Sequence, residues 1–529
     1  MGEVELVLIS LLVAVAVLAA AARTVGIPYP IVLVIGGLAL GFAPGPDVEL
    51  APDLVLVVFL PPLLYSAAFF ANLHDLKRDL RPISLLAVGL VLATMCVVAV
   101  VARWVVEDLP WGAAFALGAI VAPTDPVAAT TVARRLAVPR RVVTILEGES
   151  LINDGTALVA YRTAVAATVG GGFSLLEAGW EFVANAALGI VIGFVVAWVI
   201  SEIRRRLDDV LVEITLSLLS GYAAYLPAEA LHDWTGGAVE ASGVLAAVTA
   251  GVVLGWRAPR ISTARMRIQG YAVWETLVFL MNALLFVLIG LQLPLILDRL
   301  AGESRLTLAA QAAAVCSAVI LTRLAWQFTV PYAVRAIDRR PRQLERRADW
   351  RTRLIIGWSG MRGAVSLAAA LALPTDFPAR DTILFLAFAV IFATLVLQGL
   401  TLPTLIRRLD VRDDGAEERE ELLGRRAAAE AALLRLEELQ GEDWTREDTV
   451  DRMSRLYRYR QSRLAARAGD ADGPESYEER SLAYQRLVRE VLEAQRERIV
   501  ALRDQGAISN EVMHRIEREL DLEDERLEI

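Results

Sequence analysis

Cysteine is nearly absent from this 529-residue chain, which contains only Cys96 and Cys316. Both lie inside apolar segments and far apart in the sequence, so neither a disulfide framework nor a cysteine-based metal cluster is expected. The sequence also lacks a glycine-rich phosphate loop, a zinc-ligand spacing and a nucleophile elbow. We therefore expect no enzyme, no resident cofactor and no nucleic-acid partner.

Long apolar segments, in contrast, are abundant. Hydrophobic residues make up 56% of the chain, and the mean hydropathy is +0.48. They come in blocks of roughly 20 residues, the helix length that crosses a hydrocarbon core about 30 Å thick. We place about thirteen spans, near residues 4–22, 27–44, 53–71, 82–102, 110–133, 142–168, 176–200, 210–231, 238–255, 271–297, 307–334, 354–373 and 382–406. The first span follows Glu3 and Glu5 rather than a basic segment, so we expect it to be retained rather than cleaved.

Basic residues are distributed unequally between alternate connections of these spans. The connections on one side hold 25 arginine and lysine residues, and those on the other side hold four. Cytoplasmic loops carry the excess of positive charge. We therefore expect an N-terminus outside the cell membrane and a cytoplasmic C-terminal tail.

A small set of ionisable residues remains inside the predicted spans. These residues are Asp125, Glu149, Asp154, Arg162, Glu213, Glu275, Arg323 and Arg362. A charge at the bilayer centre costs at least about 2.5–3.5 kcal/mol, so each needs a partner, a watery cavity or a function. Counted at about 1.5 Å per residue, Asp125, Asp154 and Arg362 converge near the mid-plane, where carriers bind their substrates.

Helical spacing sorts the polar residues of the sixth span into two rows. Glu149 and Asn153 lie four residues apart and therefore share one row. Ser150 and Asp154 form the second row in the same way. We assign Arg362 to Glu149 as its counter-ion, with Asn153 bridging, which leaves Asp154 free. In the alternative, Asp154 is itself one arm of a buried ion pair. A free carboxylate in a wet cavity holds either a small cation or a proton, so competition at Asp154 suffices for antiport.

Two spans are interrupted near mid-membrane. The fifth reads ALGAIVAPTDPVAATTV, and the twelfth reads LIIGWSGMRGAVSLAAALALP. Broken backbone is tolerated at this depth only where it lines a cavity or is buried in protein. The breaks lie seven spans apart, which predicts an inverted repeat with the binding site at its centre. Freed carbonyls near Thr124 could ligate an ion. Asp125 would lie at a helix N-terminus, either compensating the ion or dipole or acting as a simple N-cap.

Three motifs, APTDPVA, EGESLINDGTALV and GMRGAVSLA, occur in this order in one membrane domain. Together they resemble the monovalent cation:proton antiporter superfamily, in the branch that contains bacterial sodium/proton antiporters and animal sodium/proton exchangers. The likeness covers about residues 5–408. It implies secondary active exchange of Na⁺ (or Li⁺ or K⁺) for H⁺, in the service of pH homeostasis. It also implies a homodimer in the lipid bilayer, in which a transport bundle moves against a dimerisation scaffold.

The same resemblance implies a role for each matching residue. Asp154 is the implied carrier of cation and proton, and Asn153 is its partner in a pair typical of electroneutral exchangers. The residues implied to line the Na⁺ site are Asp154, Ser150, Thr124 and Asp125. Glu149 and Arg362 correspond to the structural ion pair.

Several positions remain open within this resemblance. Many relatives place an acid in the third span, where this chain has Ser66, whose hydroxyl could either ligate the ion or simply pack. Glu275 matches a glutamate of relatives, and we interpret it as structural or gate-stabilising, with Arg323 as its candidate partner. Arg162 and Glu213 are interpreted as interface or packing residues.

The expected fold is an all-α polytopic membrane protein with about 13 transmembrane helices, inverted repeats and two broken crossing helices. It fills residues 1–410. Residues 411–529 carry a net charge of −10, against −9 for the whole chain. They predict a cytoplasmic tail of charged amphipathic helices, either for regulation and dimer support or without a function, with Asn510 capping the last helix. The functional alternatives are a K⁺/H⁺ antiporter and an ion-sensing or channel-like protein on the same scaffold.

Overall fold

The computed structural model describes residues 3–43, 54–170, 175–207, 209–236, 239–300, 302–337, 349–411, 413, 415–467 and 474–528. Every regular element in these ranges is a helix, which confirms the all-helical prediction. The chain divides into two compact units, Met1–Asp413 and Asp414–Ile529.

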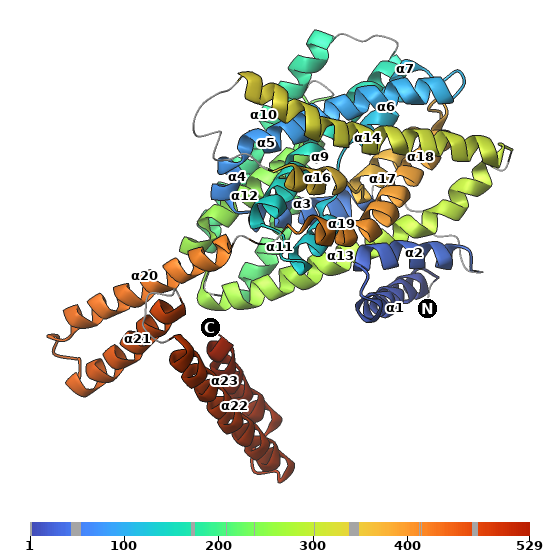
Figure 1. The fold of residues 1–529 in the computed structure, drawn as a ribbon. Coiled ribbons are helices and arrows are strands. Elements are labelled where there is room, and N and C mark those ends of the chain that lie inside the picture. Colours follow the sequence, from blue (N-terminus) through green and yellow to red (C-terminus); the bar gives the residue numbers. More distant parts are fainter. Residues whose placement is uncertain are drawn as a thin grey trace. The chain divides into compact units, whose positions relative to one another are not determined.

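The first unit is a bundle of long apolar helices (Figure 1). Its helices are α1 (Glu3–Val25), α2 (Tyr29–Gly41), α3 (Leu60–Phe69), α4 (Leu73–Arg78), α5 (Leu80–Ser84), α6 (Val91–Val105), α7 (Trp111–Val121), α8 (Pro126–Arg135), α9 (Arg140–Gly170), α10 (Leu175–Arg204), α11 (Val210–Trp234), α12 (Gly243–Ile261), α13 (Ala264–Arg299), α14 (Arg305–Ile337), α16 (Trp350–Trp358), α17 (Ala364–Leu371), α18 (Arg380–Ala393) and α19 (Gly399–Leu409). π-Helical turns at Leu54–Phe59, Leu85–Leu90 and Thr394–Gln398 continue directly into α3, α6 and α19.

Eight helical stretches in the described parts are long and apolar enough to cross a membrane, and three shorter apolar helices accompany them. The chain is thus a multi-pass membrane protein. The polar helix α9 covers the predicted sixth span at 142–168. The count of thirteen crossings and the inverted repeat remain predictions.

Both predicted interruptions are present. The first separates α7 from α8, where Pro126 occupies the first helical position and Asp125 caps the new helix. The second separates α16 from α17 within the glycine-containing segment that ends at Gly363. The two breaks meet, because the backbone N–H of Asp125 donates to the carbonyl oxygen of Met361 at 2.8 Å.

Small residues allow the closest helix contacts of this unit. α2 and α13 pack along each other extensively, and α12 packs against α3, α10 and α11. A β-carbon at Gly290 of α13 would overlap the carbonyl oxygen of Val34 in α2. Glycine is therefore required at this crossing, because the two backbones lie in direct contact.

In the described part of the second unit, four helices form two antiparallel hairpins (Figure 1). They are α20 (Ala416–Leu439), α21 (Glu447–Arg467), α22 (Pro474–Asp504) and α23 (Asn510–Glu528). Leu492 and Ile499 of α22 pack on Met513 and Leu520 of α23. The cap of α23 is not Asn510, as the sequence predicted, but the residue before it: the Ser509 hydroxyl accepts from the N–H of Val512 at 3.3 Å.

Replacing Gly290 with alanine tests the α2–α13 contact. Alanine gains up to about 1 kcal/mol in helix propensity, but the overlap with the Val34 carbonyl costs about 1–3 kcal/mol. We expect a lower midpoint of thermal unfolding in detergent. Gly179→Ala is the matched control, since a β-carbon there meets no atom within 4 Å. Equal midpoints for both variants would contradict the close contact.

Candidate ion-binding site

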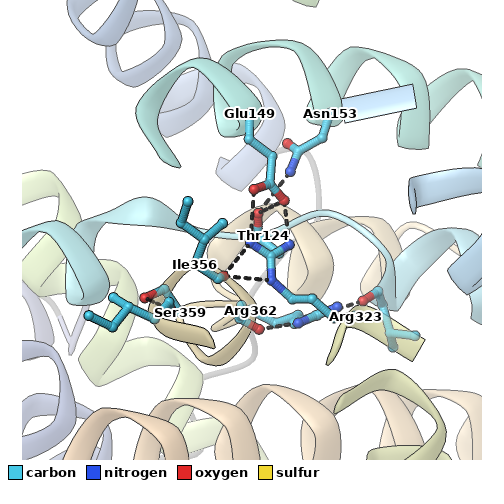
Figure 2. Close-up of polar contacts among 10 residues, drawn as sticks. Thr124, Glu149, Asn153, Arg323, Ile356, Ser359 and Arg362 are labelled. Atoms are coloured by element: carbon cyan, nitrogen blue, oxygen red, sulfur yellow. Dashed lines mark hydrogen bonds and ion pairs between the residues drawn. The ribbon is translucent and has the colours of Figure 1, made fainter. Parts of the chain in front are cut away.

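The polar residues at the centre of the first unit come from four elements. The first break supplies Thr124 and Asp125, and the second supplies Arg362. The middle of α9 supplies Glu149, Ser150, Asn153 and Asp154, and α14 supplies Arg323. Side chains far apart in the sequence therefore meet where two broken helices pass each other (Figure 2).

Glu149 and Arg323 form a buried, bidentate ion pair. Arg323 Nη2 donates to Glu149 Oε2 at 2.8 Å, and Nη1 donates to Oε1. The two side chains are only 2% and 1% exposed, respectively. Arg323 also donates to the carbonyl oxygen of Ile356 from Nε at 3.3 Å and from Nη2 at 3.1 Å (Figure 2). A fully engaged pair of this kind has little remaining capacity to bind another ion.

The predicted pairing of Glu149 with Arg362 is therefore wrong, although the two lie within electrostatic range. Arg362 Nε instead donates to the carbonyl oxygen of Val121, the last residue of α7, at 2.9 Å, and Nη1 donates to the carbonyl oxygen of Gly360. Carbonyls at a helix end lack intrahelical donors and carry partial negative charge. Arg362 thus neutralises a half-helix terminus, and this need outweighs pairing with the acid.

Asn153 connects to the ion pair through a hydroxyl. Its Nδ2 donates to Thr124 Oγ1 at 3.0 Å, and the Thr124 hydroxyl donates to Glu149 Oε1 at 3.0 Å. Asn153 Oδ1 is buried without a hydrogen-bond partner. The predicted bridging role of Asn153 is present in altered form, because the bridge runs through Thr124 and not to Arg362.

Asp125 lies where the N-termini of two half-helices converge. Its Oδ1 accepts from the N–H of Val127 at 2.8 Å, which caps α8. A β-carbon at Gly363, just before α17, would overlap the Asp125 carboxylate. Glycine at this position lets a second helix N-terminus approach the same carboxylate. Both termini carry partial positive charge, and both are directed at this side chain.

Asp154 differs from its neighbours in having no fixed partner. Among the residues that the structure describes, none donates a hydrogen bond to its carboxylate, and the residue is 6% exposed. It lies within electrostatic range of Asp125. Ser150, one turn before it on α9, is also buried. A carboxylate beside a second acid attracts either a cation or a proton.

The formal charges of the buried acids and arginines at this centre do not balance. Three acids, Asp125, Glu149 and Asp154, face two arginines, Arg323 and Arg362. The partial charges of the four half-helix ends cancel, since two N-termini and two C-termini meet here. One negative charge remains, and Asp154 is the acid that no arginine or helix terminus neutralises.

Three further predictions concerned residues outside this cluster. The Ser66 hydroxyl donates to the carbonyl oxygen of Leu63 in its own helix at 2.9 Å. Glu275 is exposed on α13. The predicted Glu275–Arg323 pair is wrong, because Arg323 is bound to Glu149.

The other two intramembrane charges are paired elsewhere. Glu213 accepts from the buried Arg204 at 2.8 Å. Arg162 Nη2 lies 2.7 Å from Glu229 Oε2.

Sequence reasoning missed the role of Arg323 as the counter-ion of Glu149. Arg323 and Arg362 are both intramembrane arginines, and their depth in the membrane does not distinguish the two. The useful signal was the helix break itself. An arginine inside a break lies beside carbonyls that need donors, whereas Arg323, in the continuous helix α14, has none of its own to cap.

Breaking the buried pair tests this geometry. Glu149→Gln leaves the Arg323 guanidinium buried without its counter-charge, so we expect a loss of about 3–5 kcal/mol of stability, measured as a lower unfolding midpoint in detergent. Glu147→Gln, two residues away, removes an exposed pair with Arg134 and should cost below about 1 kcal/mol. A double-mutant cycle should give a large coupling energy for Glu149 with Arg323 and a smaller one with Arg362. The reverse order would contradict the pairing.

Comparison with known proteins identifies the family of this chain. Residues 9–408 match the family described as "Sodium/hydrogen exchanger, transmembrane". An uncharacterised Na⁺/H⁺ exchanger of Mycobacterium tuberculosis is 36% identical, over 94% of this chain and 91% of its own length. A Bacillus pumilus protein named as a sodium, potassium, lithium and rubidium/H⁺ antiporter is 34% identical, over 73% of this chain and 58% of its own length.

The fold has a counterpart among solved structures. The sodium proton antiporter MjNhaP1 from Methanocaldococcus jannaschii, solved at pH 8, superposes with a TM-score of 0.59. The match covers 77% of this chain and 99% of that chain, at 20% sequence identity. This structural match shows a similar fold, whereas the family match and the two relatives show similarity of sequence. The chain therefore belongs to the sodium/hydrogen exchanger family of monovalent cation:proton antiporters.

Proposed function

We propose that this protein is a secondary active antiporter that exchanges Na⁺, or Li⁺ or K⁺, for H⁺, and that both substrates compete for Asp154. The observation that carries the proposal is the free carboxylate of Asp154 beside a permanently neutralised Glu149–Arg323 pair. One carboxylate cannot hold a proton and a metal cation together, so each substrate displaces the other.

The charge count supports electroneutral exchange. The empty site carries one net negative charge, and one Na⁺ or one proton brings it to zero. Both loaded forms are neutral and cross the bilayer at similar cost, whereas the empty form carries an uncompensated charge at membrane depth. Exchange of one cation for one proton follows, because only loaded carriers change sides readily.

The cation ligands in this proposal are oxygen atoms close to Asp154. Ser150 lies one turn away on α9, and Asp125 lies within electrostatic range. The Thr124 hydroxyl donates to Glu149 and accepts from Asn153, which leaves one lone pair of its oxygen for a cation. Oxygen donors of this kind suit Na⁺, Li⁺ and K⁺ alike, and the relative from Bacillus pumilus is named for all three.

We also propose that the protein is a homodimer in the cell membrane, with its N-terminus outside and its second unit in the cytoplasm. The asymmetric distribution of arginine supports this orientation. Large apolar side chains on α10, including Trp180, Phe194 and Trp198, are exposed on the single chain and suit lipid or a second copy. The charged helices α20 to α23 suit regulation or dimer support.

A K⁺/H⁺ antiporter is the first alternative, and an ion-sensing or channel-like protein is the second. The first differs only in the preferred cation, and proteoliposome flux measured with each alkali cation in turn would identify it. A channel requires a continuous aqueous path, whereas Asp154 is 6% exposed, and Leu151 and Leu158, before and after it on α9, pack in an apolar cluster. A conductance linear in voltage would favour the channel.

Asp154→Asn tests the central residue. Asparagine keeps the shape of the side chain but cannot exchange a proton or carry the negative charge, so we expect Na⁺-driven proton flux to fall to the level of empty liposomes. A pH-sensitive dye inside proteoliposomes measures the flux. Asp233→Asn, which changes an exposed residue of α11, should retain wild-type exchange. Near-normal exchange by Asp154→Asn would refute the proposal.

Electroneutrality has its own test. Proteoliposomes are clamped at different membrane potentials, and the initial rate of Na⁺-driven proton flux is recorded at each. Because both loaded forms are neutral, we expect the same rate at every potential. A rate that changes systematically with potential would mean that net charge moves in each cycle, which contradicts the charge count.

A further inference from the structure

Arg162 lies on the same face of α9 as Asp154, about two turns further along the helix. Asp154, Leu158 and Arg162 are spaced four residues apart and therefore lie along one face of the helix. At about 1.5 Å per residue, Arg162 is about 12 Å beyond Asp154. It lies toward the side that the arginine-poor loops place outside. Any path from Asp154 to that side along this face passes Leu158 and then Arg162.

The contact made by Arg162 joins α9 to two other helices. Arg162 Nη2 lies 2.7 Å from Glu229 Oε2 on α11. The other oxygen, Glu229 Oε1, accepts from the backbone N–H of Gly243 at 3.2 Å, and Gly243 is the first residue of α12. The Glu229 carboxylate on α11 thus contacts both α9, which carries Asp154, and the first residue of α12.

Apolar side chains fill the space on the Asp154 side of this contact. Leu151 and Leu158 of α9 pack in one cluster with Tyr225 of α11 and with Val244 and Val248 of α12. Their surfaces offer no ligand to a hydrated cation, so the cluster is a barrier while α9 and α12 stay together. The cluster includes residues of the three helices that the ion pair and the Gly243 contact link, together with Leu60, Leu64 and Ala68 of α3.

We propose that the Arg162–Glu229 pair is the latch of an outer gate, and that it must open for Asp154 to reach the outer side. The proposal rests on the proposed transport function. When the latch opens, α9 separates from α11 and α12, and the side chains of the apolar cluster move apart. The Asp154 carboxylate then gains access to external water. The two residues control access and do not bind the transported ion.

The exposure of the two side chains fits an interaction that must open in every cycle. Arg162 and Glu229 are 49% and 28% exposed, against 1% and 2% for Arg323 and Glu149. A partly exposed pair is worth only about 0.2–1 kcal/mol, because solvent screens it, whereas breaking a buried pair costs several times more. Glu240 also lies within electrostatic range of Arg162 and attracts it when Glu229 is released.

The test measures access directly and does not depend on transport. Leu158→Cys is introduced into a chain in which Cys96 and Cys316 are replaced with serine. Intact cells are treated with a membrane-impermeant maleimide, and the labelling rate is recorded. We expect slow labelling in this background and an increase of about fivefold when Glu229→Gln is added, consistent with the loss of a partly exposed ion pair.

Two further variants sharpen the result. Exchanging the charges, with Arg162→Glu and Glu229→Arg together, should make labelling slower than in the Glu229→Gln variant, because the ion pair between α9 and α11 is re-formed with reversed polarity, although position 229 then no longer accepts from the N–H of Gly243. Arg134→Gln is the matched control: it removes an exposed arginine 2.8 Å from Glu147 at the other end of α9 and should leave the labelling rate unchanged.

The outcomes separate this proposal from the proposed function. If Glu229→Gln labels at the background rate, or if the thiol introduced by Leu158→Cys reacts only after denaturation in every variant, the latch is wrong even where wild-type exchange is normal. Labelling that rises in Glu229→Gln and falls again with the charge exchange supports the latch even if Na⁺-driven flux is absent, and that result would refute the antiporter instead. Faster labelling in Arg134→Gln would also overturn the proposal.

Discussion

The cost of charge at membrane depth is the constraint on which this structure depends. Glu149 can be buried only because Arg323 neutralises it with two parallel hydrogen bonds, while Thr124 and the Ile356 carbonyl satisfy the remaining donors and acceptors. The pair carries no net charge. In the proposed function, the polar centre of the bundle then carries one net negative charge, on Asp154, which one monovalent ion neutralises.

The two broken helices make that arrangement possible, and each break is stabilised by the other. Asp125 from the first break caps α8, and its backbone N–H donates to the carbonyl oxygen of Met361 in the second break. Arg362 from the second break caps the end of α7 in the first. Unpaired helix ends at this depth would cost several kcal/mol per group. The reciprocal capping removes this cost.

Much of the fold could be predicted from the sequence, because apolar blocks, prolines and glycines act locally. The helical spans, both breaks and the four helices of the second unit follow from such patterns. The partner of Glu149 could not be found in this way. Arg323 lies 174 residues further along the chain, and its depth does not distinguish it from Arg362. Both arginines donate to a carbonyl oxygen near a half-helix end, so the pairing depends on which guanidinium tertiary packing brings to the Glu149 carboxylate. The pairing of Glu275 with Arg323 failed for the same reason.

Two of the ion pairs on helix α9 lie on either side of Asp154 along the helix and differ in burial. The Glu149 pair lies before Asp154 and holds α9 to α14, whereas the Arg162 pair lies after it and holds α9 to α11. The first is buried from solvent and the second is partly exposed, so the second breaks at far lower cost. A motion that separates α9 from α11 and α12 therefore leaves the Glu149–Arg323 pair intact. Asp154 would keep its electrostatic surroundings while its access to water changes, which is the condition for binding the same ions from both sides.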